Sequence, residues 1–124
     1  YFQAFTNTYA PVEKLRQKYE EALACPEIEG ISIATRADCL PTDVLALLAE
    51  LNKKTNLWVE LGLQTADAQS AAFIRRGYPL STFTMPSQNA IFPLWCISFS
   101  DFPAKAGKPF SGRLIISTAC PFKA

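Results

Sequence analysis

The first part of the chain alternates short β-prone runs with amphipathic stretches. Runs rich in β-branched and aromatic residues predict strands over residues 1–5, 30–34 and 57–65. Apolar residues at helical spacing predict helices over residues 12–24, 42–54 and, with a weaker pattern, 67–76. Three βα units in this order favour an α/β fold with parallel strands, as in an open sheet or part of a barrel. In both, ligands bind beyond the carboxyl ends of the strands.

The strand over 57–65 has one apolar face and one polar face. Alternating positions place Leu57, Val59, Leu61 and Leu63 on one side, and Trp58, Glu60, Gly62 and Gln64 on the other. Gln3 and Ser32 can contribute to the same polar face. A buried parallel strand is usually apolar on both sides, so the polar face indicates a candidate site. The alternative is that this face meets solvent at the edge of the sheet.

The pattern changes within residues 73–88. All of the 11 acidic residues except Asp101 precede residue 68, whereas most of the nine prolines follow residue 77. Beyond about Phe83 the chain has prolines and serines but no regular period. We therefore expect a partial α/β core over residues 1–77 and an irregular tail over residues 78–124.

Charge and cysteine spacing exclude several classes of function. A net charge of +1 gives no electrostatic footprint for nucleic acid or for an anionic membrane surface. The apolar run "AIFPLWCISF" is too short to span a bilayer, so we expect a cytoplasmic protein. The sequence has no histidine, and its four cysteines are far apart in sequence, so we expect buried or unpaired thiols and no metal site. These cysteines are Cys25, Cys39, Cys96 and Cys120.

Three blocks, "YFQAFTNTYAPVEKL", "ISIATRADCLPTDVLALLAELNKKT" and "WVELGLQT", closely resemble an uncharacterised YhcC-like family of bacterial radical SAM proteins over about residues 1–80. The resemblance implies a partial (β/α)6 barrel. It also implies a 4Fe–4S cluster held by three cysteines and bound S-adenosylmethionine, which is cleaved reductively to a 5′-deoxyadenosyl radical. In the family the cluster cysteines precede the segment like "YFQAF", so none of these ligands is present in this chain. The resemblance does not indicate a substrate.

The resemblance also implies five cofactor-binding residues, namely Asn7, Thr8, Arg36, Gln64 and Arg76. Asn7 and Thr8 stand where such proteins hold the methionine amino group, although Thr8 can instead cap a helix. Arg36 can meet a carboxylate or a ribose, or simply pair with Asp38 on the surface.

For the other two residues the resemblance and a structural role again compete. Gln64 suits ribose hydroxyls, or it is a structural amide. Arg76 resembles an arginine beside the methionine carboxylate, or it interacts with a helix dipole. Tyr78 stands where the family usually has histidine.

A lost nucleotide just after Phe83 is one hypothesis for the change in pattern. Codons allowed for the following residues can encode "HLIFGLPGE" in the restored frame, a glycine-rich motif like the one expected there. We expect this chain alone to be catalytically inactive, since it lacks cluster ligands. The alternatives are a small βα nucleotide- or phosphate-binding module, which lacks a glycine-rich phosphate signature here, and a non-functional truncated product.

Overall fold

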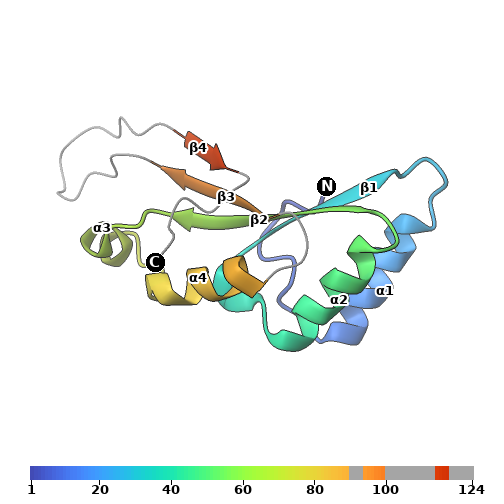
Figure 1. Cartoon of the computed structure of the whole chain (residues 1–124), viewed down its shortest axis with the longest axis horizontal. Helices are drawn as coiled ribbons and strands as arrows, with labels where there is room; N and C mark the ends of the chain where they lie inside the picture. The colour runs from blue at the N-terminus through green and yellow to red at the C-terminus, as the bar shows by residue number, and fades with distance from the viewer. Residues whose placement is uncertain (90–93, 100–113, 118–124) are drawn as a thin grey trace.

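The computed structural model describes residues 1–89, 94–99 and 114–117 (Figure 1). In chain order its elements are α1 (Val12–Leu23), β1 (Gly30–Thr35), the short 3-10 helix η1 (Ala37–Cys39), α2 (Thr42–Asn52), β2 (Asn56–Gln64), α3 (Ala68–Phe73), α4 (Leu80–Asn89), β3 (Leu94–Phe99) and β4 (Leu114–Ser117). The protein is therefore mixed α/β, as the sequence predicts.

The strands form one four-stranded sheet in the order β1-β2-β3-β4. Strand β1 is parallel to β2, β2 is parallel to β3, and β4 is antiparallel to β3. The carboxyl ends of the three parallel strands therefore point to one end of the sheet, where ligands of α/β folds bind. Within the described residues the sheet is open, and the expected partial barrel is not shown.

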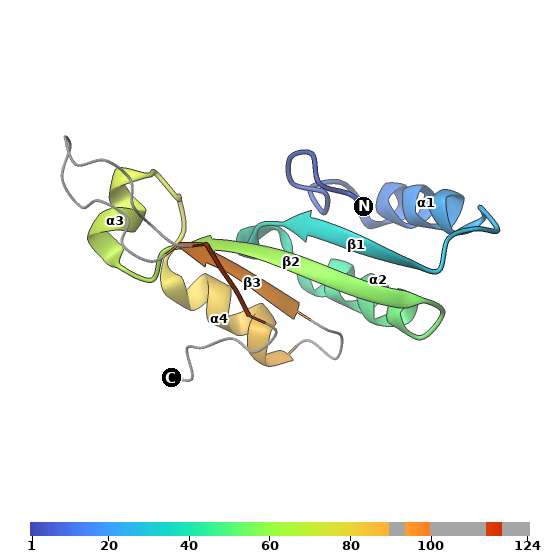
Figure 2. The ribbon, with the colours of Figure 1, turned by 90° about the horizontal axis from the view of Figure 1, so that it is seen from above.

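One face of the sheet is covered by helices, and the opposite face carries none of the described helices (Figures 1 and 2). Helices α1, α2 and α4 lie on the covered face, and α3 lies beyond the end of β2. The buried side chains of β2 are Leu57, Val59, Leu61 and Leu63, each at most 1% exposed. They contact the buried stripes of α1 and α2, which are Leu15, Tyr19, Val44, Leu47, Leu48 and Leu51. Burial of one such side chain contributes about 1.5–3 kcal/mol.

The predicted strand over residues 1–5 is wrong. Only Phe2 pairs with β1, through a single parallel bridge to Ile33. Its amide donates to the carbonyl of Ser32 at 2.8 Å, and its carbonyl accepts from the amide of Ala34 at 2.9 Å. Phe5 adopts a left-handed backbone with φ of 61°, which a strand cannot accommodate, so the chain turns away from the sheet.

The prediction of an irregular tail over residues 78–124 is wrong for the part of it that the structure describes. Helix α4 and strands β3 and β4 lie in this part of the chain, and the side chains of Phe83 and Cys96 are buried in the core. Residues 90–93, 100–113 and 118–124, which include Cys120, lie outside the described residues. The proposed frameshift and the domain boundary at residue 77 stay predictions.

Candidate functional site

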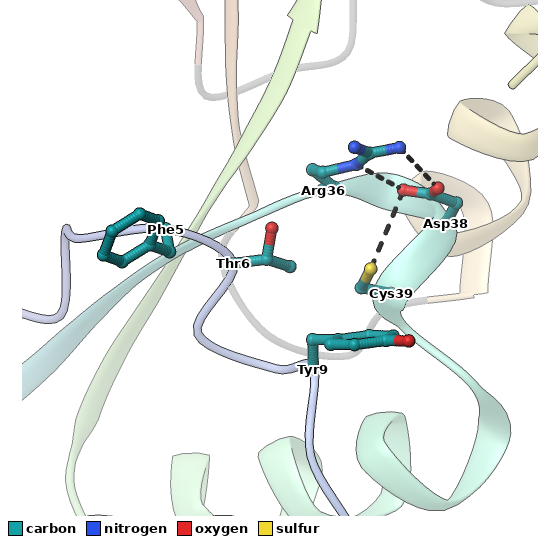
Figure 3. A pocket seen from close by; sticks show the side chains of 6 residues that line it. All are labelled: Phe5, Thr6, Tyr9, Arg36, Asp38 and Cys39. Atoms are coloured by element: carbon teal, nitrogen blue, oxygen red, sulfur yellow. Dashed lines mark hydrogen bonds and ion pairs between the residues drawn. The ribbon is translucent and has the colours of Figure 1, made fainter. Parts of the chain in front are cut away.

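A pocket lies at the carboxyl end of β1, between the loop of residues 5–9 and η1 (Figure 3). Its volume is about 520 Å³, and its lining residues are Phe5, Thr6, Tyr9, Arg36, Asp38 and Cys39. A second depression of about 510 Å³ adjoins it, and the two share Tyr9, Asp38 and Cys39. The pocket thus lies at the end of the sheet where parallel α/β folds bind ligands.

Arg36 and Asp38 form a two-pronged ion pair at the rim of this pocket. The Arg36 Nε donates to Asp38 Oδ1 at 2.9 Å, and Nη2 donates to Oδ2 at 2.7 Å. The surface pair that the sequence offers as an alternative is therefore formed. The pair keeps appreciable contact with solvent, since 49% of the Arg36 side chain and 29% of the Asp38 side chain are exposed.

Two exposed aromatic rings stand beside this pair. Phe5 is 97% exposed and Tyr9 is 82% exposed, and Figure 3 shows them on different sides of Thr6. A phenylalanine with positive φ is uncommon, and a strained backbone costs on the order of 1–3 kcal/mol. Neither ring was predicted as a site residue, because Phe5 lies in a β-prone run that favours a strand and Tyr9 follows that run without a pattern of its own.

The Cys39 thiol faces the same pocket and shows no sign of activation. Burial, followed by the charge of the Asp38 carboxylate, raises the pKa of this thiol. The thiolate is the reactive form of cysteine, so a raised pKa makes Cys39 a poor nucleophile at neutral pH.

Asn7 and Thr8 are buried and hold the loop of residues 5–9 against β1. The Asn7 Nδ2 donates to the carbonyls of Phe2 and Ala34 at 2.8 and 3.0 Å. The Thr8 hydroxyl donates to the carbonyl of Cys39 and also hydrogen-bonds to the Thr35 hydroxyl, each at 2.5 Å. Thr8 does not cap α1, whose N-cap residue is Pro11 without a side-chain bond. Both side chains thus hold in place the loop that forms one wall of the pocket.

Arg76 is buried beneath the carboxyl end of β2. Its Nη1 donates to the carbonyl of Thr65 at 2.5 Å and to that of Leu63 at 3.5 Å, and its Nε donates to the carbonyl of Tyr78 at 3.0 Å. These bonds fix Arg76, which follows α3, to main-chain oxygens of residues that precede this helix and of Tyr78, which follows it. The structural role of Arg76 is therefore hydrogen bonding to specific main-chain carbonyls, and not a general interaction with the dipole of a helix.

Tyr78 joins the two arginines of the site. Its ring centroid lies 5.1 Å from the Arg76 guanidinium carbon and 5.5 Å from that of Arg36, and its hydroxyl donates to the carbonyl of Gly62 at 2.9 Å. Arg36 Nη2 also donates to the carbonyl of Arg76 at 3.3 Å. This role of Tyr78 was not predicted, because contacts of two arginines with one ring leave no pattern in a single sequence.

Gln64 lies on the polar face of β2, as predicted, and is half-buried. Its backbone is left-handed, with φ of 69°, and its amide folds back over Gly62. Farther along the same face, the Glu60 carboxylate accepts from the Ser32 hydroxyl at 2.8 Å and from the Tyr1 hydroxyl at 2.5 Å. The polar face is confirmed, including Ser32. A contact between Gln64 and a ribose stays a prediction.

The described residues do not hold the ligands of a metal cluster. No group of three or more histidine, cysteine, aspartate or glutamate side chains converges there. Cys25 is exposed after α1, Cys39 lies at the pocket, and Cys96 is buried in β3. The 4Fe–4S cluster that the resemblance implies for the longer protein, with its ligands outside this segment, stays a prediction. Among the helices that the structure describes, none is long and apolar enough to cross a membrane.

The chain is similar to longer proteins that are named without an activity. It is 59% identical over 83 residues to the uncharacterized protein YtqA of Bacillus subtilis, which covers 67% of this chain and 26% of that protein. It is 41% identical over 91 residues to protein YhcC of Escherichia coli, which covers 73% of this chain and 29% of that protein. An uncharacterized protein of Methanocaldococcus jannaschii is 39% identical over 82 residues, or 65% of this chain and 26% of that protein.

These comparisons support the YhcC-like part of the resemblance and contradict the radical SAM part. None of the relatives carries a radical SAM name, and no family model matches the chain. The restriction to bacteria is also wrong, since Methanocaldococcus jannaschii is an archaeon. No solved structure matches the chain. The chain spans little more than a quarter of the length of these relatives.

Proposed function

We propose that the pocket lined by Phe5, Tyr9 and Arg36 binds an adenosyl ligand, S-adenosylmethionine, as part of a longer protein. The observation that carries this proposal is that two exposed aromatic rings and a guanidinium line one pocket at the carboxyl end of a parallel strand. Exposed aromatic faces stack on nucleobases, and they attract a cationic group such as a sulfonium. The volume of about 520 Å³ is in the range of small-molecule sites.

Phe5 supports this proposal most directly. An almost fully exposed phenylalanine in a left-handed backbone contributes nothing to the core, and the strain must be offset elsewhere. The buried bonds of Asn7 and Thr8 offset it by holding the loop on β1. A fixed loop that presents an exposed ring beside a pocket is suited to stacking on a ligand.

The longer protein's chemistry stays a prediction. The resemblance implies that S-adenosylmethionine is cleaved reductively at a cluster, and no described residue of this chain supplies ligands for one. The expected inactivity of this chain alone also stays a prediction. In the longer protein, we further propose that additional strands cover the polar face with Glu60 and Ser32 and close the sheet toward a barrel.

The alternative module for nucleotides or phosphates is less favoured. Arg36 offers the donors that a phosphate needs, but Asp38 already takes two of them and places a negative charge beside the guanidinium. A non-functional truncated product is the remaining alternative, and it predicts no saturable binding of any adenosyl compound.

Titration calorimetry of the 124-residue chain with S-adenosylmethionine tests the proposal. We compare Phe5→Ala with Phe73→Ala, which removes another exposed phenylalanine that does not line the pocket. Loss of base stacking costs about 1–3 kcal/mol, so Phe5→Ala should weaken binding about fivefold or more. Phe73→Ala should leave the affinity unchanged. No saturable binding by the parent chain, or equal effects of the two substitutions, would exclude this pocket.

A further inference from the structure

We propose that Tyr78 is a positioning residue, whose ring holds the Arg36 guanidinium in one orientation at the rim of the pocket before a ligand binds. This inference rests on the proposed function, because it concerns the same pocket and names the residue that orders its guanidinium. Tyr78 is not among the residues that line the pocket, and its ring lies against Arg36, so it acts on the ligand through Arg36.

The turn of residues 76–78 lies beside the Arg36 guanidinium. The Arg76 carbonyl accepts from Arg36 Nη2 at 3.3 Å, and the Tyr78 ring centroid lies 5.5 Å from the Arg36 guanidinium carbon. Between them, Gly77 has φ of 86°, a conformation that favours glycine, and a Cβ built on it would lie 3.7 Å from Arg36 Nη2. A turn that follows α3 thus surrounds one side of a guanidinium that follows β1.

The Tyr78 ring is held in place by contacts that do not involve Arg36. Its hydroxyl donates to the carbonyl of Gly62 in β2 at 2.9 Å, and its carbonyl accepts from Arg76 Nε at 3.0 Å. The half-buried ring also packs against the hydrophobic core. Because its position does not depend on Arg36, the ring can restrain that side chain.

Arg36 needs such a restraint because it is exposed. Its side chain is 49% exposed, and its charged partner, Asp38, is only two residues away on the same surface segment. A surface ion pair between two side chains adds little stability. A guanidinium on an aromatic face gains a further contact, and a side chain that is already ordered does not have to be immobilised when the ligand binds.

The restrained guanidinium keeps one nitrogen for the ligand. Arg36 uses Nε and Nη2 for Asp38 and for the carbonyl of Arg76, and its Nη1 makes no hydrogen bond within the part of the chain that the structure describes. The same pocket is lined by the exposed rings of Phe5 and Tyr9. Holding Arg36 in one orientation therefore offers a donor in a fixed place to a ligand that stacks on these rings.

Two variants of Tyr78 isolate the effect of its ring. Tyr78→Phe and Tyr78→Leu both lose the hydroxyl and its bond to Gly62, and only Tyr78→Leu also loses the ring face beside Arg36. In calorimetry of the full chain, Tyr78→Leu should bind S-adenosylmethionine about two- to tenfold more weakly than Tyr78→Phe, which is the cost of ordering one arginine side chain. Equal affinities of these two variants would overturn the inference.

The same substitutions in an Arg36→Met background test whether the ring acts through Arg36. This background has no Arg36 guanidinium to order, so the difference in affinity between Tyr78→Phe and Tyr78→Leu should disappear. A structural effect of the ring on the fold, or an effect through the guanidinium of Arg76, would leave the difference in place. An undiminished difference would therefore overturn the inference while leaving the proposed function intact.

The order of the Arg36 side chain can also be measured without a ligand. NMR relaxation of the Arg36 Nε–H group reports its motion on the picosecond-to-nanosecond timescale. The order parameter should be lower in Tyr78→Leu than in Tyr78→Phe, and an unchanged value would overturn the inference even where Arg36→Met binds too weakly for comparison. If Arg36 is ordered but the parent chain binds no S-adenosylmethionine, the proposed function fails, and the inference fails with it.

Discussion

Arg16 on α1 donates two parallel hydrogen bonds to Glu50 on α2, from Nη1 at 2.9 Å and from Nη2 at 2.8 Å. Lys54 donates to the same carboxylate at 2.9 Å. This contact joins two helices that are separated in sequence by β1. Since both side chains are about 40% exposed, at 38% and 42%, solvent screens the pair and its contribution to stability is modest.

The pair predicts an acid-dependent loss of stability. Hydrogen bonds from Arg16 and then Lys54 lower the pKa of Glu50 from 4.5 to about 2. A lowered carboxyl pKa contributes stability above the unfolded value, and this contribution is lost as the pH falls from 4.5 toward about 2. In urea unfolding, Glu50→Gln should be less stable than the parent at neutral pH, and the gap should narrow over this range. Glu21→Gln, which removes only a bond with Gln17, serves as the control. A gap independent of pH would contradict the assignment.

Tyr19 predicts the opposite dependence at alkaline pH. Its ring is fully buried, its hydroxyl donates to the carbonyl of Asn7 at 2.7 Å, and burial raises its pKa from 10 to about 12. The raised pKa means that stability is complete below pH 10 and declines as the pH rises toward 12. Tyr19→Phe should lower the free energy of unfolding by about 1–3 kcal/mol at neutral pH, because the Asn7 carbonyl loses its donor. Between these two pH values the stability of Tyr19→Phe should decline less than that of the parent. Chemical unfolding at several alkaline pH values measures both effects, and parallel declines would refute them.

Two glycines provide a test of the pairing between β1 and β2. A Cβ at Gly30 would lie 2.6 Å from the carbonyl oxygen of Asn56, its partner in the parallel register, so the backbone must move. A Cβ at Gly62 would meet the flexible amide end of Gln64 at 2.9 Å, which can rotate away. Gly30→Ala should therefore destabilise the fold by about 1–3 kcal/mol, and Gly62→Ala by less than about 1 kcal/mol. Equal losses in thermal or urea unfolding would show that the register differs.

Periodicity predicted the elements whose packing is regular. Val44, Leu47, Leu48 and Leu51 recur at helical spacing and are buried in α2, and the alternation of Leu57 with Trp58 matches the buried and exposed faces of β2. The strand predicted over residues 1–5 was wrong because β-prone composition does not reveal the left-handed turn at Phe5. The later strands were missed because β3 gains its stability from pairing with β2, a long-range contact that its own sequence does not encode.

The candidate site was only partly readable from the sequence. The position at the strand ends follows from the order of elements, and Arg36, which was selected through the resemblance, lies at the pocket there. Asn7, Thr8 and Arg76 were selected through a resemblance. Their side chains bond to main-chain oxygens, and their contact with a cofactor stays a prediction. Buried polar groups must find partners within the fold, and those partners depend on tertiary structure. The frameshift after Phe83 also stays a prediction, and the nucleotide sequence at that codon tests it.

The last prediction concerns Arg76, for which a structural role and ligand binding lead to different results. Removing its guanidinium takes the side-chain donor from the carbonyls of Thr65 and Tyr78, whereas the Leu63 carbonyl still accepts from the Thr65 amide at 2.9 Å. Arg76→Met should therefore destabilise the fold by about 1–3 kcal/mol or more. Arg75→Met is the control, because the neighbouring Arg75 is exposed and its side chain makes no hydrogen bond to the described residues. Urea unfolding of the two variants measures the difference.

Binding by Arg76→Lys then separates the two roles. Lysine keeps the positive charge but cannot reach several carbonyls with a planar fork, so stability should fall while any long-range attraction for a ligand carboxylate is retained. Arg76 is 9% exposed and its guanidinium donates to main-chain oxygens. We therefore expect the affinity ratio of S-adenosylhomocysteine to 5′-methylthioadenosine, which lacks the amino acid group, to stay at the parent value. A direct contact with the ligand carboxylate would instead lower that ratio several-fold. That result would reassign Arg76 from supporting the end of β2 to binding the ligand.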